Sequence, residues 1–263
     1  MKLCFSTLGC ADRSLDSILT LVRENGMDAV EIRGIDGKMF LGEHPDFAPE
    51  KIAQVKERFL KSGVKPLSLN LSYAGHDIGY SEDGFAPYVR ELEIAAALEI
   101  PYLRVFGDCI EGDREEAIGK ILYALKKITK AAQKGGQTVL LEVHGDINSV
   151  ETLEPVLSEM QVFDNFGLIW DIANSDMVYK ENWQPLYEYI RPFIKHVHIK
   201  DHIRETLTLT DLGKGEIPIR AIVDRMLADG YEGYFSLEWE KKWHPELSEI
   251  EDALKDYQRI MTQ

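Results

Sequence analysis

Residues 194–201 read Ile-Lys-His-Val-His-Ile-Lys-Asp, and this stretch carries the pattern that decides the fold. His196, His198 and Lys200 alternate with apolar residues, so polar and apolar side chains point to opposite faces of a predicted strand. In a closed barrel the apolar face packs against surrounding helices, and the polar face must then point to the barrel axis. Desolvating so many polar groups is costly unless they serve a function. The stretch therefore indicates a barrel with a site on its axis.

Similar runs recur along the chain and alternate with amphipathic or alanine-rich segments. The predicted strands are Lys2–Ser6, Ala29–Arg33, Pro66–Leu71, Tyr102–Phe106, Thr138–His144, Gly167–Asp171, Ile194–Lys200 and Tyr234–Trp239. The predicted helices are Leu15–Asn25, Glu50–Ser62, Phe85–Glu99, Arg114–Lys134, Ser149–Glu159, Trp183–Tyr189, Pro218–Asp229 and Glu246–Met261. This alternation is typical of a single (β/α)8 TIM barrel of the α/β class. A doubly wound open sheet is the alternative, but no Gly-x-Gly-x-x-Gly turn follows the first strand.

Length and composition agree with one barrel. The chain has 263 residues, of which 44% are hydrophobic and 29% charged, so it can bury a large core and is not of the disordered class. Because no Pro/Ser-rich linker divides it, we expect residues 1–263 to form one domain.

Charge and cysteine usage narrow the partners and the compartment. The net charge of −15 argues against nucleic acid, which requires clustered Lys and Arg, although a buried basic pocket for a small anion stays open. The N-terminus lacks a signal-peptide pattern, and no apolar run is long enough to span a membrane. The three cysteines form no Cys-x-x-Cys pair, so we expect reduced thiols in a cytoplasmic protein.

Four predicted strands end on an acid or an imidazole. Glu142, Asp171, His198 and Glu238 follow one another at intervals of 29, 27 and 40 residues, each about one β/α unit. On adjacent strands, these side chains should converge at the top of the barrel. Three carboxylates and one imidazole suit one divalent ion such as Mn, Zn, Mg or Co, with open positions for substrate oxygens. A single carboxylate at a strand end is often only a helix cap or a surface ion pair, but four such accidents together are hard to explain.

From Glu142 to the C-terminus the chain resembles the sugar phosphate isomerase/epimerase family. These xylose-isomerase-like TIM barrels include ketose 3-epimerases, inosose isomerases and dehydratases, and hydroxypyruvate isomerase. The resemblance rests on Leu141-Glu142-x-His144, Asp171, His196-Val-His-Ile-Lys-Asp201, Arg204, Leu212-Gly-Lys-Gly-Glu-Ile-Pro and Gly230-Tyr-Glu-Gly-Tyr-Phe-Ser-Leu-Glu-Trp239. The first half of the chain matches the family only in its general pattern.

The resemblance implies a metal-dependent isomerase or epimerase of a sugar or polyol ketone. Its metal ligands would be Glu142, Asp171, His198 and Glu238, and the two glutamates would also transfer protons on opposite faces of the substrate. One glutamate would remove the proton α to the carbonyl, and the ion would stabilise the resulting enediolate. The partner would be a small-molecule sugar or polyol. Members of the family often form dimers or tetramers, so a homo-oligomer is left open.

Further polar residues are candidates for substrate binding. The resemblance assigns Arg204 to the substrate, and His144 and Lys200 share the inward face of their strands; each could also be a structural or surface residue. In the family's ketose 3-epimerases a substrate-contacting histidine stands where this chain has Asn174, which argues against 3-epimerisation of free ketoses.

Other inward positions are predicted to be structural. Glu31 and Arg104 both point inward, where we expect a buried ion pair beneath the site. His196, deeper than His198, is expected to be a packed histidine. Trp243, after the last strand, could line the mouth of the barrel.

Two other activities compete with isomerisation. A dehydratase would use the same proton abstraction and then lose a β-hydroxyl group from a polyol ketone. An endonuclease IV-type nuclease shares the barrel, but it would require a histidine-rich multi-zinc site and a basic DNA-binding face. The chain has only seven histidines and a net charge of −15, so the nuclease is the weakest of the three hypotheses.

Overall fold

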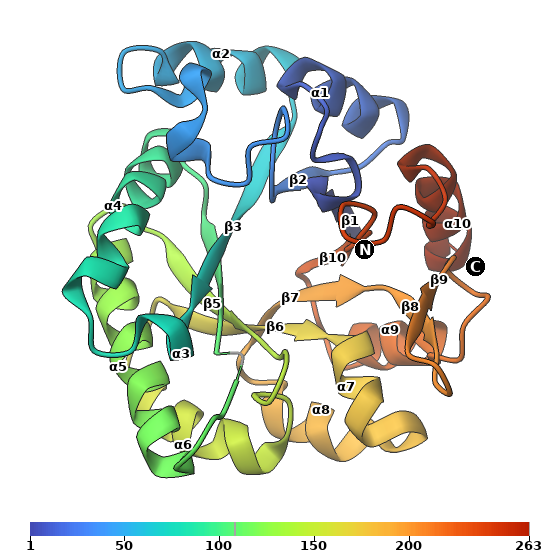
Figure 1. Cartoon of the computed structure of the whole chain (residues 1–263). Helices are drawn as coiled ribbons and strands as arrows, with labels where there is room; N and C mark the ends of the chain where they lie inside the picture. Colours follow the sequence, from blue (N-terminus) through green and yellow to red (C-terminus); the bar gives the residue numbers. More distant parts are fainter. Residues whose placement is uncertain (108, 263) are drawn as a thin grey trace.

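A computed structural model describes residues 1–107 and 109–262. Eight parallel strands close into a barrel in the order β1-β10-β7-β6-β5-β4-β3-β2 (Figure 1). They are β1 (Lys2–Ser6), β2 (Ala29–Ile32), β3 (Lys65–Ala74), β4 (Tyr102–Phe106), β5 (Thr138–Glu142), β6 (Phe166–Asp171), β7 (Ile194–Ile199) and β10 (Tyr234–Leu237). The predicted TIM barrel is confirmed, and all eight predicted strands overlap an observed one.

The helices form a ring around the barrel (Figure 1). They are α1 (Leu15–Glu24), α2 (Ile52–Ser62), α3 (Gly75–Ile78), α4 (Glu82–Ala97), α5 (Arg114–Gln133), α6 (Val150–Met160), α7 (Ile172–Tyr179), α8 (Gln184–Ile190), α9 (Ile219–Ala228) and α10 (Ile250–Thr262). Their boundaries follow local chemistry. The Ser14 side chain caps α1, Asp113 caps α5, and Gly63 ends α2 in a left-handed conformation with a φ of 70°.

The main core lies between the strands and the helices, where the apolar side chains of the strands pack outward. Near the N-terminal ends of the strands a second, small cluster of Cys4, Ala29 and Leu67 packs with Tyr102 and Tyr234. Polar groups are therefore left for the upper part of the barrel interior, toward the C-terminal ends of the strands.

Several short elements were not expected from the sequence, among them α3, α7 and a hairpin after β7. Helix α7 begins immediately after β6, and residues 172–176 are all buried, so it shows no amphipathic pattern. After β7 the chain forms an antiparallel hairpin of β8 (Asp201–Ile203) and β9 (Thr208–Thr210), whose strands are too short to give an alternation signal.

The loop that follows this hairpin explains part of the motif beginning at Leu212. The Asp201 carboxylate accepts hydrogen bonds from the backbone N–H groups of Gly213, Gly215 and Ile217, at 2.9, 3.1 and 3.2 Å. A Cβ atom on Gly215 would lie 2.1 Å from Asp201 Oδ1, so only glycine fits there. This part of the motif therefore stabilises the loop.

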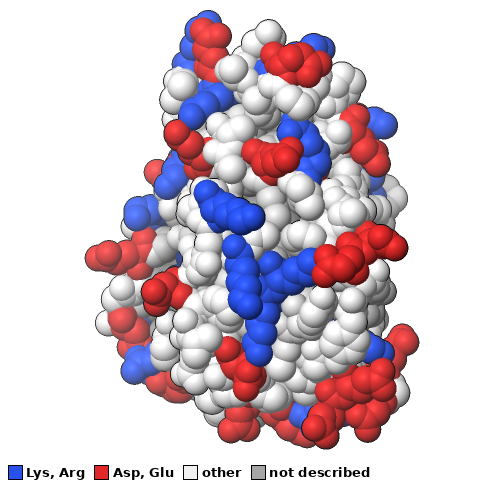
Figure 2. Space-filling view, turned by 90° about the vertical axis from the view of Figure 1, so that its left-hand side faces the viewer, with Lys and Arg blue, Asp and Glu red and all other residues white. Residues whose placement is uncertain are grey.

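The outer surface carries both signs of charge. Figure 2 shows the side of the molecule on the left of Figure 1, where Lys and Arg gather near the centre with Asp and Glu around them. On α5, Lys126 pairs with Glu159 at 2.7 Å. Within the described residues, no helix is long and apolar enough to cross a membrane.

Candidate metal centre

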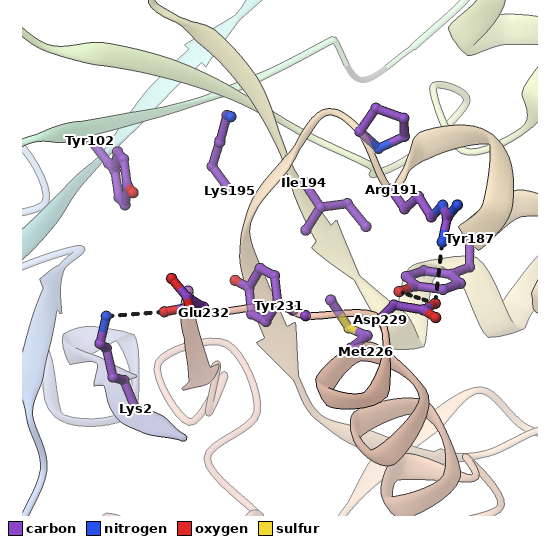
Figure 3. A pocket seen from close by; sticks show the side chains of 13 residues that line it. Lys2, Tyr102, Tyr187, Arg191, Ile194, Lys195, Met226, Asp229, Tyr231 and Glu232 are labelled. Carbon is purple, nitrogen blue, oxygen red and sulfur yellow. Dashed lines mark hydrogen bonds and ion pairs between the residues drawn. The ribbon is translucent and has the colours of Figure 1, made fainter.

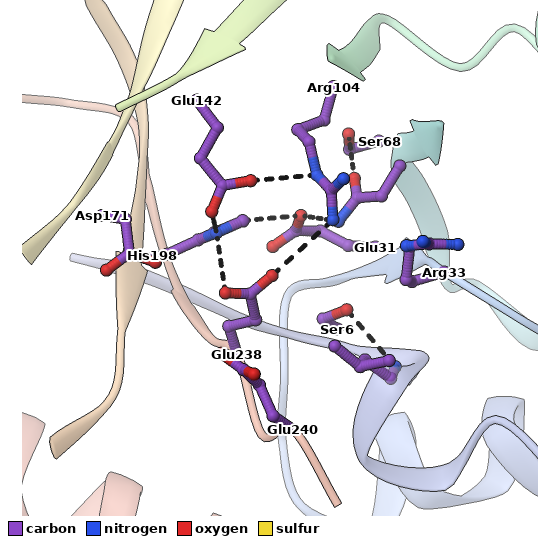
Figure 4. Close-up of polar contacts among 12 residues, drawn as sticks. Ser6, Glu31, Arg33, Ser68, Arg104, Glu142, Asp171, His198, Glu238 and Glu240 are labelled. Carbon is purple, nitrogen blue, oxygen red and sulfur yellow. Dashed lines mark hydrogen bonds and ion pairs between the residues drawn. The ribbon is translucent and has the colours of Figure 1, made fainter. Parts of the chain in front are cut away.

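Glu142, Asp171, His198 and Glu238 lie together inside the upper end of the barrel (Figure 4). Each offers one ligand atom, and these atoms lie within 4.8 Å of one another. All four side chains are buried, with at most 4% of each residue exposed. They come from the last residues of β5 and β6, from β7, and from the position after β10, so the structure brings together the four residues that the spacing singled out.

The imidazole of His198 has a defined orientation. Its Nδ1 lies 3.2 Å from Glu142 Oε1 and 3.3 Å from Glu238 Oε2, so this nitrogen faces the cluster. Its Nε2 lies 3.1 Å from Glu31 Oε2 on the other side. A carboxylate that accepts a hydrogen bond from Nε2–H leaves the lone pair of Nδ1 for a cation when the ring is neutral.

The two carboxylate oxygens of Asp171 have different partners. Its Oδ1 accepts hydrogen bonds from the backbone N–H groups of Ala173 and Asn174, both at 2.9 Å, and so caps the N-terminus of α7. Its Oδ2 lies in the cluster, 2.8 Å from Lys200 Nζ. A helix cap and a ligand position are therefore compatible in one carboxylate.

Two buried cations compensate the charge of the cluster. Arg104 Nε lies 3.0 Å from Glu142 Oε2, without the alignment of a hydrogen bond, and Nη2 lies 3.8 Å from Glu238 Oε1. Lys200 Nζ contacts Glu238 Oε2 at 2.7 Å and also Glu240 Oε1 at 2.5 Å. These pairs reduce the repulsion that closely spaced carboxylates would otherwise exert.

The surroundings shift the pKa of each acid differently. Burial and repulsion by Glu238 would raise the pKa of Glu142, but His198 and Arg104 lower it overall. Burial would likewise raise the pKa of Glu238, yet attraction by His198 and Lys200 brings it well below the usual value. The pKa of Asp171 is raised by burial, against the attraction of Lys200.

The pKa values of the basic groups are raised, whereas burial alone would lower them. Burial would lower the pKa of His198, but Glu238, Glu31 and Glu142 raise it well above the ordinary value. The pKa of Lys200 is likewise raised well above its ordinary value, because the attraction of Asp171 and Glu238 outweighs the effect of burial. A cluster that attracts protons this strongly is one that attracts cations.

The predicted ion pair between Glu31 and Arg104 is wrong. Glu31 instead accepts hydrogen bonds from His196 Nε2 at 2.8 Å and from Asn70 Nδ2 at 2.8 Å, besides its contact with His198. Both residues point inward as predicted, but neighbouring strands place Glu31 beside the histidines of β7 and Arg104 beside the two glutamates. The expected packed histidine, His196, is fully buried.

The predicted substrate-binding residues fall into two groups. His144 and Lys200 line a pocket of about 180 Å³ above the cluster, and the rings of His144 and Phe106 have centroids 4.9 Å apart. Asn174 and Arg204 do not line it. Asn174 Nδ2 donates to Asp171 Oδ2 at 2.7 Å, whereas Arg204 makes two contacts of 2.9 Å with Asp176. Substrate contact by these two residues stays a prediction.

The pocket also contains residues that the sequence analysis did not assign to the site. Arg33, Glu240 and Leu8 line it together with Trp243, which was predicted at the mouth. Glu240 lies beyond the end of β10, where strand alternation no longer shows which way a side chain points. Arg33 ends the predicted strand Ala29–Arg33, and the alternation that turns Glu31 inward puts Arg33 on the same face, so this signal could have found it.

A separate pocket of about 640 Å³ opens at the other end of the barrel (Figure 3). It is lined by residues at the starts of strands, among them Lys2, Tyr102 and Ile194. In TIM barrels the chemistry takes place at the C-terminal ends of the strands. The candidate site is therefore the smaller pocket above the four clustered residues.

The donor set fits a divalent ion. Three carboxylate oxygens and one imidazole nitrogen suit Zn²⁺, Mn²⁺, Co²⁺ or Mg²⁺, and their mutual approach within 4.8 Å leaves room for one ion between them. Glu31 and Arg104 already hold two of the candidate ligands from behind, as supporting residues do in metal sites.

A sequence model for the family described as xylose isomerase-like TIM barrel matches residues 19–260. No curated protein matches the chain significantly.

Three solved structures share its fold over almost their whole length. The IOLI protein with a zinc atom is 22% identical, with 99% of this chain and 96% of that one covered and a TM-score of 0.78. The 3-keto-D-glucoside 4-epimerase YcjR from E. coli is 18% identical, with 100% of both chains covered and a TM-score of 0.75. The probable 3-DHS dehydratase AsbF from Bacillus anthracis is 16% identical, with 100% and 99% covered and a TM-score of 0.78.

Proposed function

This chain belongs to the xylose isomerase-like TIM-barrel family, and on that premise we propose that it is a divalent-metal-dependent isomerase or epimerase of a sugar or polyol ketone. One observation carries the proposal. Two buried glutamates, Glu142 and Glu238, stand in one cluster with Asp171 and His198 beneath an open pocket. An epimerase among the similar structures supports the reaction class.

Glu142, Asp171, His198 and Glu238 would hold the ion. When bound, it supplies positive charge to the substrate oxygens, on which negative charge develops as a proton leaves the neighbouring carbon. The zinc of the IOLI protein supports a divalent ion in this fold.

Glu142 and Glu238 would transfer the proton. A proton α to a carbonyl is too weakly acidic for a carboxylate free in water, so the base must be positioned and the developing charge stabilised. Arg104 contacts both glutamates from behind, and His198 Nδ1 lies between them at 3.2 and 3.3 Å. Both carboxylates are thereby fixed at the floor of the pocket. One would remove the proton and the other would return it.

The dehydratase is a second candidate for a specific reason. Lys200 lines the pocket, and its Nζ lies 2.7 Å from Glu238 and 2.8 Å from Asp171. An ammonium group there can donate a proton to a departing hydroxyl, which isomerisation does not require. The dehydratase among the similar structures supports this alternative.

Deuterium exchange tests the shared first step. Mn²⁺-loaded protein is incubated in D₂O with a panel of ketoses, free and phosphorylated, and the carbon next to the carbonyl is followed by NMR. Mass spectrometry of the product formed in ordinary water separates the two candidates, because isomerisation conserves the mass and dehydration lowers it by one water.

Matched variants identify the bases. Glu142→Gln and Glu238→Gln should each lower the exchange rate by about two to four orders of magnitude. Glu91→Gln is the control, because Glu91 is another buried glutamate, 2% exposed, that accepts a hydrogen bond from Gly42 N outside the site. Full exchange in both site variants would refute the mechanism.

A further inference from the structure

Three cations line the pocket above the cluster, and one of them differs from the others. Arg104 and Lys200 are each paired with carboxylates of the cluster. Arg33 forms no ion pair with any residue in the described part of the chain (1–107 and 109–262). In Figure 4 no dashed line joins Arg33 to the carboxylates drawn around it.

The backbone and one end of the Arg33 guanidinium are held in place. Its backbone N–H donates to Thr7 Oγ1 at 2.8 Å, and its Nη2 donates to Ser72 Oγ at 2.8 Å. Its Nη1 is buried and has no hydrogen-bond partner. Only 8% of the residue is exposed. Arg33 is therefore a positioned cation with an unused donor.

Such an arrangement is costly in the absence of a ligand. Burying a charge without an opposite charge is strongly unfavourable, which is why buried arginines are normally paired. Burial, together with repulsion by Arg104, lowers the pKa of Arg33 to about 10, and the attraction of the more distant Glu238 and Glu142 offsets this only in part. Its side chain still carries its charge at neutral pH and is available to an anion.

We infer that Arg33 binds an oxyanion of the substrate, a carboxylate or a phosphate, at the opposite side of the pocket from the reacting carbon. A guanidinium can donate two parallel hydrogen bonds to such a group. Arg33 lines the same pocket as Glu142 and Glu238, so one small molecule can reach both. The inference rests on the proposed function and specifies its substrate class as an acidic or phosphorylated ketone.

The rest of the lining agrees with a small, charged ligand. Leu8, Phe106 and Trp243 supply apolar walls to this pocket of about 180 Å³, against which the carbon chain of a ligand can pack. A neutral sugar would leave Nη1 of Arg33 without an anion, whereas a terminal carboxylate or phosphate would satisfy it.

Three ketoses that differ only at C6 test the inference. Binding of D-fructose, D-fructuronate and D-fructose 6-phosphate to the Mn²⁺-loaded protein is measured by isothermal titration calorimetry. We expect at least one of the anions to bind more tightly than D-fructose, and the comparison of the two identifies carboxylate or phosphate. Arg33→Gln should remove about a ten- to hundredfold advantage of that anion and leave D-fructose unchanged. Arg33→Lys should retain part of it.

Arg58→Gln, on the outer helix α2, is the control and should change none of the affinities. The assignment of Arg33 is overturned if neither anion binds more tightly than D-fructose, or if Arg33→Gln weakens all three ketoses equally. Metal-dependent deuterium exchange of the substrate, compared between the unaltered protein and the Glu142→Gln and Glu238→Gln variants, tests the proposed function separately. Intact exchange combined with equal ketose affinities would therefore refute only the role of Arg33.

Discussion

His198 Nε2 lies 3.1 Å from Glu31 Oε2, and this contact determines which nitrogen of the ring is available to a cation. Glu31 is fully buried and also accepts hydrogen bonds from His196 and Asn70. Burial would raise the pKa of Glu31, but His196 and His198 lower it well below the usual value, so it is an anionic acceptor. In the neutral form of the ring, the proton of His198 would therefore stay on Nε2, leaving Nδ1, which faces Glu142 and Glu238, for a cation.

Glu31→Gln should therefore weaken metal binding, although Glu31 is not itself one of the proposed metal ligands. A neutral amide holds the imidazole less firmly and makes it less basic, so the affinity for Mn²⁺ or Zn²⁺ should fall by about 10- to 100-fold. Titration calorimetry of the metal measures this. Glu91→Gln, again a buried glutamate outside the site, should leave the affinity unchanged. Equal affinity in wild type and Glu31→Gln would show that the contact is only structural.

Two buried arginines should respond oppositely to the same substitution. Arg104→Met leaves Glu142 and Glu238 without their guanidinium, and the loss of one partner of a buried ion pair costs about 3–5 kcal/mol of unfolding free energy. Arg33→Met removes a charge that has no ion-pair partner in the described residues, so stability should stay the same or rise. Urea unfolding curves compare the two variants. A large destabilisation by Arg33→Met would contradict the unpaired state of that cation.

Metal binding should protect the start of α7. Asp171 Oδ1 holds the N–H groups of Ala173 and Asn174, so opening this turn disturbs the proposed ligand. Hydrogen exchange at these amides should slow by up to about a hundredfold when the free metal concentration is a hundred times its dissociation constant. Asp171→Asn keeps a capping oxygen but is a poor ligand, so its exchange rates should not respond to metal. The same metal-dependent slowing in that variant would contradict the link.

The thiols should differ sharply in reactivity. Cys4 and Cys10 are 0% and 4% exposed, and burial raises the pKa of Cys10 to about 12 and that of Cys4 well above its usual value. Thiolate is the reactive form, so at mildly alkaline pH only the partly exposed Cys109 should react quickly with Ellman's reagent. All three should react after unfolding. Cys109→Ser should remove the fast phase, and a fast phase that persisted would contradict the burial of the other two.

The fold could be predicted because its signals are local. Strand alternation and helix periodicity depend on near neighbours in the chain, and each of the eight predicted strands overlaps an observed one. The grouping of Glu142, Asp171, His198 and Glu238 could be predicted for a similar reason. Residues at the same end of consecutive parallel strands must be close in space.

The contacts behind the cluster could not be predicted in the same way. Strand alternation correctly predicted that Glu31 and Arg104 point into the barrel. Which residues they contact, however, depends on the stagger between neighbouring strands. A register shift between Val30 and Glu31 alters that stagger, and nothing in the sequence marks it. Arg33 shares the inward face of Glu31 in the predicted strand Ala29–Arg33, so alternation could have found it, whereas the start of α7 is buried on every side and gives no amphipathic pattern.

The proposed metal ligands and the proposed anion-binding residue Arg33 come from different halves of the barrel. The proposed metal ligands all come from β5, β6, β7 and the end of β10, whereas Arg33 follows β2 in the other half. Mutations accumulating in the first third of the gene could therefore change which molecule is accepted while the reaction itself is inherited intact. Proteins descended from this one could acquire new substrates by exchanging N-terminal segments. Engineered chimeras that join half-barrels from two proteins would change substrates in the same way.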